Sequence, residues 1–235
     1  MTDYHLKPIP VEPDPGIYRE HEFKDSPLVP VQENEKIRIE MQYPERGCKN
    51  AESRCLLRKE VQDMLQDAAA KLPEGYKFVI WDAWRPFALQ KELFETYSEA
   101  IICDFHLEDL DEKERVRKIS MFVANPVHDT EFPPAHTTGG AIDLTIEKPD
   151  GNLMEMGTGF DSFSGATRTA YFETNAAEGV KDAEIIRTNR RILYHIMLEA
   201  GFTNLPSEWW HYEYGDMNWA HARNQKAIYQ GIFSY

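Results

Sequence analysis

Hydrophobic and polar residues alternate with a period of two in several short stretches of the chain, which is typical of β-strands. Residues 37–41 and 141–146 show this alternation most clearly. Residues 76–81 are short and apolar, and residues 209–214 are rich in aromatic side chains, which strands favour. Strands are therefore predicted at residues 37–41, 76–81, 141–146 and 209–214.

In four other stretches the apolar residues recur at helical spacing. The predicted helices cover residues 53–72, 86–100, 108–123 and 183–200. Pro73-Glu74-Gly75 ends the first helix, Pro86 suits the first turn of the second, and Asp182 can cap the last. This order of elements predicts an α+β fold, a single domain whose mainly antiparallel central sheet carries its helices on one side.

The first 35 residues differ in composition from the rest of the chain. They hold the prolines Pro8, Pro10, Pro13, Pro15, Pro27 and Pro30. Proline lacks a backbone donor and disfavours helix, so residues 1–35 are predicted to be an extended arm or a lid. Residues 36–235 are predicted to be the folded domain. Within it, residues 45–50 and 147–180 are expected to be loops, and loops as long as the second commonly carry function.

Charge and cysteine content limit the partners and the location. The chain has 26 Lys and Arg against 40 Asp and Glu, a formal charge of -14, which opposes binding to nucleic acid or anionic membranes. Its beginning has no apolar leader, and no later run approaches a membrane span, so a cytoplasmic protein is expected. Free thiols are then the default for Cys48, Cys55 and Cys103, although a bridge between Cys48 and Cys55 stays open.

Two stretches carry candidate metal ligands, 134–146 and 207–214. Parity along the second places His211 on one face with Trp209 and Glu213, so Glu208 reaches His211 only from the turn before the strand. In the first, His136 precedes Asp143 by a distance of roughly 23 Å if the chain is extended. The chain must therefore double back, and Gly139-Gly140 permits this.

Two histidines and a carboxylate with a fourth position open form a catalytic zinc set. A histidine in an aromatic strand is more often a hydrogen-bonded core residue, so each stretch alone is a weak signal. The two stretches together favour one zinc site made of His136, Asp143 and His211, with Glu208 as the general base.

These stretches resemble the zinc D-alanyl-D-alanine peptidases, whose pattern is Ser-x-His-x-x-Gly-x-Ala-x-Asp followed much later by Glu-x-x-His. Here the pattern runs from Pro134 through His136 to Asp143, and then from Glu208 to His211. Trp81-Asp82-Ala83-Trp84-Arg85-Pro86, Met156-Gly157-Thr158-Gly159-Phe160-Asp161 and Glu208-Trp209-Trp210-His211 are similar to motifs of the D-alanyl-D-alanine dipeptidases known from vancomycin resistance. The resemblance covers about residues 40 to 215 and leaves out the arm.

The resemblance implies one zinc per chain, a hedgehog/DD-peptidase-like fold, and a small dipeptide as substrate. It gives Glu208 the transfer of a proton from water to the leaving amine, Arg85 the stabilisation of the oxyanion, and Asp161 the binding of the substrate's ammonium group. Apart from the resemblance, Arg85 has a structural alternative, a salt bridge to Asp82. Pro134 replaces the family's serine and removes a hydroxyl that would help to hold the substrate.

Two other functions stay open. The same site could act on peptidoglycan stem peptides as a D,D-carboxypeptidase or endopeptidase, although the expected lack of an export signal counts against this. A non-catalytic zinc-binding domain is the third reading, because the related hedgehog signalling domain keeps such a fold and metal. The presence of both Glu208 and Arg85 favours an enzyme.

Overall fold

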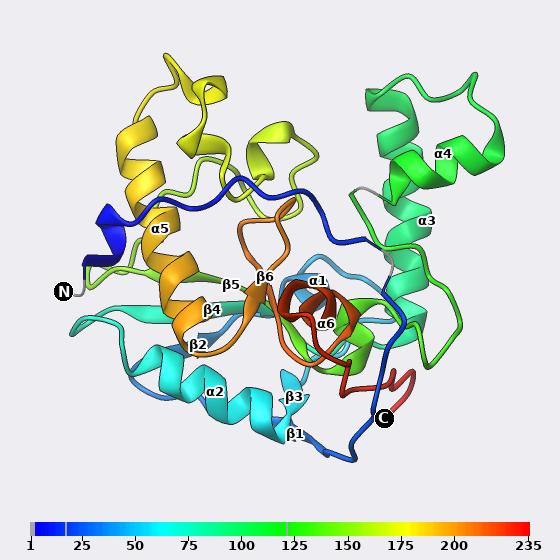
Figure 1. Ribbon diagram of the computed structural model, residues 1–235, viewed down its shortest axis with the longest axis horizontal. Coiled ribbons are helices and arrows are strands. Elements are labelled where there is room, and N and C mark those ends of the chain that lie inside the picture. Colours follow the sequence, from blue (N-terminus) through cyan, green and yellow to red (C-terminus); the bar gives the residue numbers. More distant parts are fainter. Residues whose placement is uncertain (1–2, 17, 121) are drawn as a thin grey trace.

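The computed structural model describes residues 3–16, 18–120 and 122–235. Residues 1, 2 and 17 of the predicted arm and residue 121 of the predicted helix 108–123 lie outside the described residues. The chain folds around one central sheet with helices and long loops about it (Figure 1). In the described part of the chain no helix is both long enough and apolar enough to cross a bilayer.

The central sheet has five strands in the order β2-β4-β5-β7-β6. Their bounds are β2 (Ile37–Ile39), β4 (Lys77–Asp82), β5 (Ala141–Glu147), β6 (Thr203–Asn204) and β7 (His211–Glu213). β2 runs parallel to β4, and the other three neighbouring pairs are antiparallel. The predicted α+β fold with a mainly antiparallel sheet is therefore confirmed. A separate antiparallel pair joins β1 (Leu28–Pro30) to β3 (Leu56–Arg58).

The helices differ in length and in what they cover. They are α1 (Gln42–Glu45), α2 (Lys59–Ala69), α3 (Phe87–Asp104), α4 (Glu112–Ile119), α5 (Ala183–Glu199) and α6 (Met217–Arg223). Short 3-10 turns lie at Asp3–Leu6, Ala135–Thr138, Gly165–Thr167, Tyr171–Glu173 and Asn175–Ala177. α2 and α5 contact each other and share the main apolar core with the sheet. α3 and α4 form a second apolar cluster at one end of the molecule (Figure 1).

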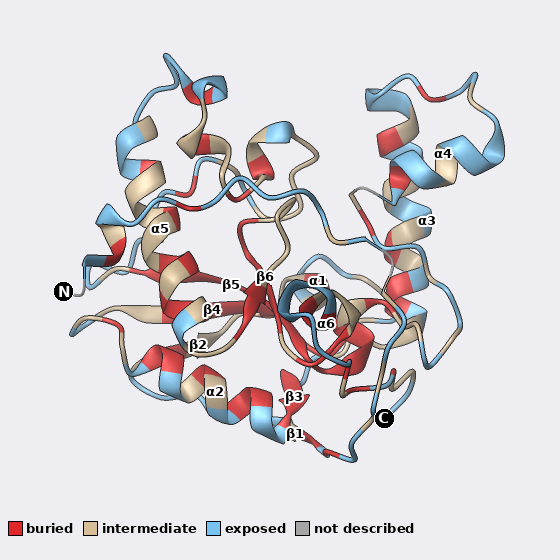
Figure 2. Ribbon diagram, viewed as in Figure 1, coloured by how far each residue is buried: buried red, intermediate tan, exposed pale blue. Residues whose placement is uncertain are grey.

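The strand β5 separates two different environments. All seven of its residues are buried, and the central strands form one continuous buried layer in Figure 2. Ile146 lines a cavity together with Ile192 and Ile196 of α5, so its face of the sheet lies under the helices. Thr145, the preceding residue, lines a different cavity with Trp81. The predicted alternation of 141–146 therefore divides an apolar face from a polar one.

The sequence pattern placed some element ends wrongly. The predicted helix 53–72 begins only at Lys59, because residues 56–58 pair with β1, and three successive buried residues suit a strand better than one helix face. The strand predicted at 209–214 keeps only His211–Glu213, since the residues before it form a turn. Helix 108–123 shortens to Glu112–Ile119.

Three other local predictions can be compared with the structure. Asp182 precedes α5 as expected, but it has a left-handed backbone (φ 59°), and its side chain makes no capping hydrogen bond. Residues 42–45 form the short helix α1, where a strand end and a loop were predicted. The three cysteines are free, so the bridge left open between Cys48 and Cys55 is not formed.

Most of the described N-terminal arm lacks regular structure, as its prolines predict, apart from the turn at Asp3–Leu6 and strand β1. Figure 1 shows this segment crossing the molecule from the side of α5 toward the side of α3. Tyr4 and Ile9 are buried. His195 Nε2 of α5 lies 2.9 Å from the Lys7 carbonyl oxygen, which connects the arm to this helix.

Candidate metal centre

Neighbouring strands place three ionisable residues in one row across the polar face of the sheet. Asp143 of β5 is paired in register with His211 of β7 on one side and with Asp82 of β4 on the other. The second pairing depends on a register shift between Ile80 and Asp82, which is a β-bulge or similar irregularity. Bulges commonly redirect side chains next to functional sites. Here the shift places Asp82 opposite Asp143.

His136 joins this row because the chain reverses at Gly139-Gly140, as predicted. Gly139 has a left-handed backbone (φ +73°), and a Cβ there would lie 2.4 Å from a Leu28 methyl carbon. A Cβ on Gly140 would lie 2.3 Å from the Tyr214 carbonyl oxygen. Both positions therefore require glycine. The 3-10 turn at Ala135–Thr138 then carries the His136 imidazole back over Asp143.

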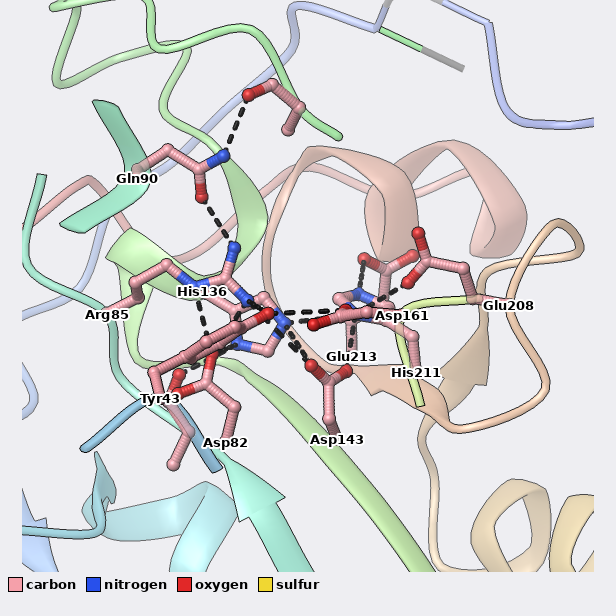
Figure 3. A network of polar contacts seen from close by, with 12 residues as sticks. Tyr43, Asp82, Arg85, Gln90, His136, Asp143, Asp161, Glu208, His211 and Glu213 are labelled. Atoms are coloured by element: carbon pink, nitrogen blue, oxygen red, sulfur yellow. Dashed lines mark hydrogen bonds and ion pairs between the residues drawn. The ribbon is translucent and has the colours of Figure 1, made fainter. Parts of the chain in front are cut away.

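The three predicted ligand side chains converge, with one ligand atom from each lying within 4.8 Å of the others. His136 Nε2 lies 3.1 Å from His211 Nδ1 and 3.2 Å from Asp143 Oδ2 (Figure 3). His211 Nδ1 lies 3.0 Å from Asp143 Oδ1. All three residues are buried. Two imidazole nitrogens and a carboxylate directed at one point match the nitrogen and oxygen ligands that zinc takes.

The outer nitrogen of each imidazole has its own acceptor. His136 Nδ1 lies 2.7 Å from the Ala83 carbonyl oxygen, and His211 Nε2 lies 3.1 Å from Glu213 Oε2. If each outer nitrogen carries the proton and donates it, the inner nitrogens keep their lone pairs free to bind a metal. Metal-binding histidines almost always have such an outer partner, which fixes the tautomer and the ring orientation. The residues present therefore fit a zinc ion.

Charge within the buried group is balanced by pairing. Burial alone would raise the pKa of Asp143, but the neighbouring His136 and His211 outweigh it and hold that pKa well below its usual range. Burial lowers the pKa of His211, and its hydrogen bonds to Asp143 and Glu213 outweigh burial and hold the pKa well above its usual value. A positive charge is therefore favoured at this point of the structure, whether a proton or a metal supplies it.

Glu208 reaches this group from the turn before β7, as parity predicted. Its backbone N–H donates to the Leu205 carbonyl (2.9 Å), which closes the turn. Its Oε2 lies 3.9 Å from His211 Nδ1. Burial raises the pKa of Glu208 to about 8, although the nearby His211 opposes the shift. A carboxyl group with a raised pKa beside a ligand set is suited to accept and return a proton near neutral pH.

Arg85 forms the salt bridge to Asp82 that was predicted as its structural alternative. Its guanidinium donates twice to Asp82 Oδ2, at 2.9 and 2.7 Å, and once to Gln90 Oε1 at 2.8 Å. Its Nη2 also lies 3.8 Å from Asp143 Oδ2, and Arg85 lines the same cavity as the three candidate ligands. The structural salt bridge is therefore present, and it holds the charge beside the candidate metal centre.

Asp161 lies across the same cavity but already has partners. Arg46 Nη1 donates to its Oδ2 at 2.7 Å, the Tyr97 hydroxyl donates to the same oxygen at 2.9 Å, and the Tyr43 hydroxyl donates to Oδ1 at 3.3 Å. Burial raises the pKa of Asp161, while Arg46 opposes the shift. Its backbone has a positive φ of 58°, a left-handed conformation that few residues other than glycine, asparagine and aspartate adopt.

One cavity of about 430 Å³ joins these groups. Its lining includes the three candidate ligands together with Arg85, Asp161, Glu208 and Pro134. Pro134 precedes the turn that carries His136. It stands in the position of the family's serine, and it lines the cavity. His128 instead packs against Phe87 and Phe233, with ring centroids 4.8 and 4.6 Å away.

Several residues that contact Arg85, Asp161 or His211 had no predicted role in the site. They are Tyr43, Arg46, Gln90, Tyr97 and Glu213, and Asp82 was named only as a salt-bridge partner. Parity had placed Glu213 on the face of His211, which was a usable signal. The contact of Arg46 with Asp161 spans 115 residues, and no local pattern predicts it.

Comparison with known proteins gives relatives along most of the chain. A D-alanyl-D-alanine dipeptidase of Synechocystis is 30% identical over 183 residues, which is 72% of this chain and 74% of that protein. One from Escherichia coli is 28% identical over 69% of this chain and 68% of its own. The solved zinc complex of the vancomycin resistance D,D-pentapeptidase VanY is 14% identical, with a TM-score of 0.41, and the match covers 84% of this chain and 91% of that one.

The family comparison bears directly on the candidate residues. The family model described as D-ala-D-ala dipeptidase matches residues 44–229. This range includes the ligand group, Glu208, Arg85 and Asp161, and it leaves out the N-terminal arm. Since the match spans well over half of the sequence, the chain belongs to the D-alanyl-D-alanine dipeptidase family of the M15 peptidases.

Proposed function

We propose that the protein is a zinc-dependent dipeptidase that hydrolyses D-alanyl-D-alanine, or a related dipeptide with free termini. The observation that carries the proposal is the convergence of His136 Nε2, His211 Nδ1 and the Asp143 carboxylate, with a separate acceptor for the outer nitrogen of each imidazole. Family membership and the names of the relatives support the reaction. We assign the catalytic domain to residues 36–235 and the arm to residues 1–35.

In this proposal His136, Asp143 and His211 hold the zinc ion. When bound, zinc supplies a Lewis acid and lowers the pKa of a water molecule to about 7, which makes a nucleophile available at neutral pH. Ala83 and Glu213 keep the two imidazoles in the tautomers that leave their inner nitrogens free. These two contacts thus fix the orientation of both imidazoles.

Glu208 is the general base and then the general acid. Its carboxylate removes the proton from the attacking water and delivers that proton to the amine that leaves when the C–N bond breaks. Burial raises its pKa to about 8 without a metal, and a cation in the adjacent ligand set favours the ionised form. Glu208 can therefore be ionised before attack and return the proton afterwards.

Arg85 stabilises the negative charge that develops on the scissile carbonyl oxygen. Its guanidinium is buried, is held by Asp82 and Gln90, and cannot deprotonate at neutral pH. A charge fixed in advance needs no reorganisation during the reaction, and this is the main source of electrostatic catalysis.

Asp161 receives the substrate's ammonium group. Arg46 and Tyr97 already donate to one of its carboxylate oxygens, and among the described residues Oδ1 has only the longer contact with Tyr43. The ammonium group would add a donor at Oδ1, on a carboxylate that its existing partners hold in place. On the other side of the site Pro134 provides no hydroxyl, so we propose looser recognition of the substrate's C-terminal residue.

We also propose a cytoplasmic location. The three cysteines of the chain are free in the structure. Free cysteines fit the reducing compartments of the cell, where disulfides are rare.

Purified protein loaded with zinc should be assayed on D-Ala-D-Ala, L-Ala-L-Ala, N-acetyl-D-Ala-D-Ala and a peptidoglycan stem peptide. Rapid turnover of D-Ala-D-Ala with little turnover of the blocked or longer substrates is the expected result. Preferential cleavage of the stem peptide would replace the proposal with a D,D-carboxypeptidase or endopeptidase. A protein that holds zinc and turns over none of these substrates would be a non-catalytic zinc-binding domain.

A further inference from the structure

The N-terminal arm contributes to the wall of the catalytic cavity. Asp14 and Pro15 line the same cavity as the ligand group. His136, Asp143 and His211 are only 5%, 2% and 3% exposed, whereas the Asp14 side chain is 41% exposed. The ligand group therefore forms the floor of the cavity, and the arm lies at its rim.

Arg168 holds the arm at this rim. Its Nη1 lies 3.0 Å from Asp14 Oδ2, and its Nη2 donates to the Glu12 carbonyl at 3.0 Å. The Arg168 carbonyl in turn accepts from Nη1 of the buried Arg190 at 2.7 Å, and Arg190 also donates to the Met156 carbonyl. One buried guanidinium thus joins both ends of residues 156–168, the segment that carries Asp161.

The arm is also fixed on both sides of this point. Before it, Ile9 is buried, and its backbone N–H donates to Glu173 at 3.1 Å. After it, the Arg19 guanidinium lies 4.4 Å from the ring centroid of Phe132, another residue of the cavity lining. The backbone of Glu22 then donates to the Ala227 carbonyl at 2.8 Å. Residues 12–15 therefore form a strap between two anchored parts of the arm, Ile9 on one side and Arg19 and Glu22 on the other.

We infer that this strap, Glu12 to Pro15, sets the length of substrate that the cavity accepts. The inference rests on the proposed dipeptidase function and adds a determinant of specificity to it. The family match begins at residue 44, so the strap lies outside the part of the chain that the match covers. Arg168 ties the strap to the segment of Asp161, which is where the amino end of the substrate is proposed to bind.

The strap acts on peptides that extend beyond the dipeptide at the amino end. Each added residue lengthens an extended peptide by about 3.3–3.6 Å, so a tripeptide whose last bond is cleaved must project past Asp161. In this inference the added residue meets the strap, which lines the same cavity, so the strap must move and the contacts of Arg168 must break. A free dipeptide ends at Asp161 and requires no such movement.

The test compares Arg168→Ala with the parent protein, using kcat/KM for D-Ala-D-Ala and for D-Ala-D-Ala-D-Ala. The ratio of tripeptide to dipeptide activity should rise about fivefold or less, because both partners of the ion pair are partly exposed and such pairs are worth up to about 1 kcal/mol. Asp14→Ala removes the same ion pair from the other side. The double variant should therefore raise the ratio by less than the product of the two single effects.

Arg187→Ala is the matched control, because Arg187 forms an exposed ion pair with Glu184 on α5 and is absent from the cavity lining. Its ratio should equal that of the parent. Zinc content and melting temperature, measured for every variant, separate a change of specificity from a loss of folding.

Three results would overturn the inference. If the parent cleaves the dipeptide but neither Arg168→Ala nor Asp14→Ala changes the ratio, the strap does not set length, and the dipeptidase function stands. If the parent already cleaves the tripeptide as well as the dipeptide, no length limit exists. If the zinc-loaded parent does not cleave the dipeptide at all, the proposed function fails, and the strap inference fails with it.

Discussion

The two faces of strand β5 are equally buried but differ in their contacts: one packs against apolar side chains, and the other pairs ionisable groups. Ile142, Leu144 and Ile146 belong to the main apolar core, and Ile146 borders residues of α5. Asp143, on the other face, lies between two histidines and an arginine. Apolar packing needs only volume and shape, whereas each buried ionisable group needs a partner in a defined direction. The first face therefore tolerates change within a volume limit, and the second does not.

This contrast separates stability from activity along a single strand. Burying charges costs free energy that their mutual attraction often does not recover, so buried ion pairs are weak evidence for stability. The polar face nevertheless keeps Asp82, Arg85, Asp143, His211 and Glu213 nearly inaccessible to water. In the proposed function this arrangement serves the reaction, so substitutions on the two faces should have different effects on stability and activity.

The largest effect is expected from the loss of a ligand. His136→Ala, Asp143→Ala or His211→Ala should weaken zinc binding by more than the 10–100-fold that is typical when a hydrogen-bond partner of a ligand is lost, and activity should nearly vanish. The parent should hold about one zinc per chain. Elemental analysis after dialysis measures both, with His128→Ala as a control histidine that lies outside the ligand group. Full zinc in all three ligand variants would refute the assignment.

Glu208→Gln should separate chemistry from metal binding. Loss of a general base typically lowers kcat by about 10²–10⁴-fold. Zinc content should stay at the parent's value, because Glu208 is proposed as a base and not as a ligand. Loss of zinc together with activity would instead make Glu208 a ligand.

On the apolar face, Ile146→Ala should affect stability alone. Truncating a fully buried isoleucine typically costs about 2–5 kcal/mol of unfolding free energy. Ile146 has no exposed surface and faces away from the ligand group. Denaturant unfolding measures the loss, and kcat/KM per folded molecule should stay near the parent's value. A large fall in kcat/KM would show that the two faces are coupled.

Asp161→Asn tests the substrate end of the polar face. The variant should lower kcat/KM for the free dipeptide by about 1.4 kcal/mol or more, at least tenfold, since a charged partner of the ammonium group is lost. The penalty for N-acetylation of the dipeptide should shrink at the same time. An unchanged acetylation penalty would place the ammonium site elsewhere.

The smallest effect should come from Thr145→Val. Thr145 precedes Ile146 in β5 and lies on the opposite, polar face. The Thr145 hydroxyl is buried and has no hydrogen-bond partner within the described ranges. An unsatisfied buried polar group costs about 1–3 kcal/mol, so removing the hydroxyl should stabilise the fold by roughly 1 kcal/mol. A melting temperature below the parent's would show that the hydroxyl is satisfied in solution.

Short-range patterns in the sequence predicted the elements that local forces specify. The alternation in 141–146 identified both faces of β5, and the glycines at 139–140 identified the reversal that brings His136 back. Parity located Glu208 in the turn before β7. Each of these predictions depends on contacts or steric limits within a few residues of sequence.

Long-range pairing accounts for most of what the sequence could not predict. Leu56 and Leu57 fit the apolar spacing of a helix, and only pairing with β1, almost thirty residues earlier, makes them a strand. The partners of Asp161 come from residues 64 to 118 positions away. No period or motif encodes such contacts, so a lone substrate-binding carboxylate was predicted where the structure has a network.

The pairing of β7 with β5 has a consequence for folding kinetics. Asp143 and His211 are separated by 68 residues, and β7 has only three. Closing so long a loop is slow, because it costs conformational entropy. The few contacts of so short a strand do not offset this cost until neighbouring elements are in place. We expect the ligand group to form after the folding transition state. Zinc should therefore slow unfolding and leave the folding rate nearly unchanged, so that the metal acts as a latch on a completed fold.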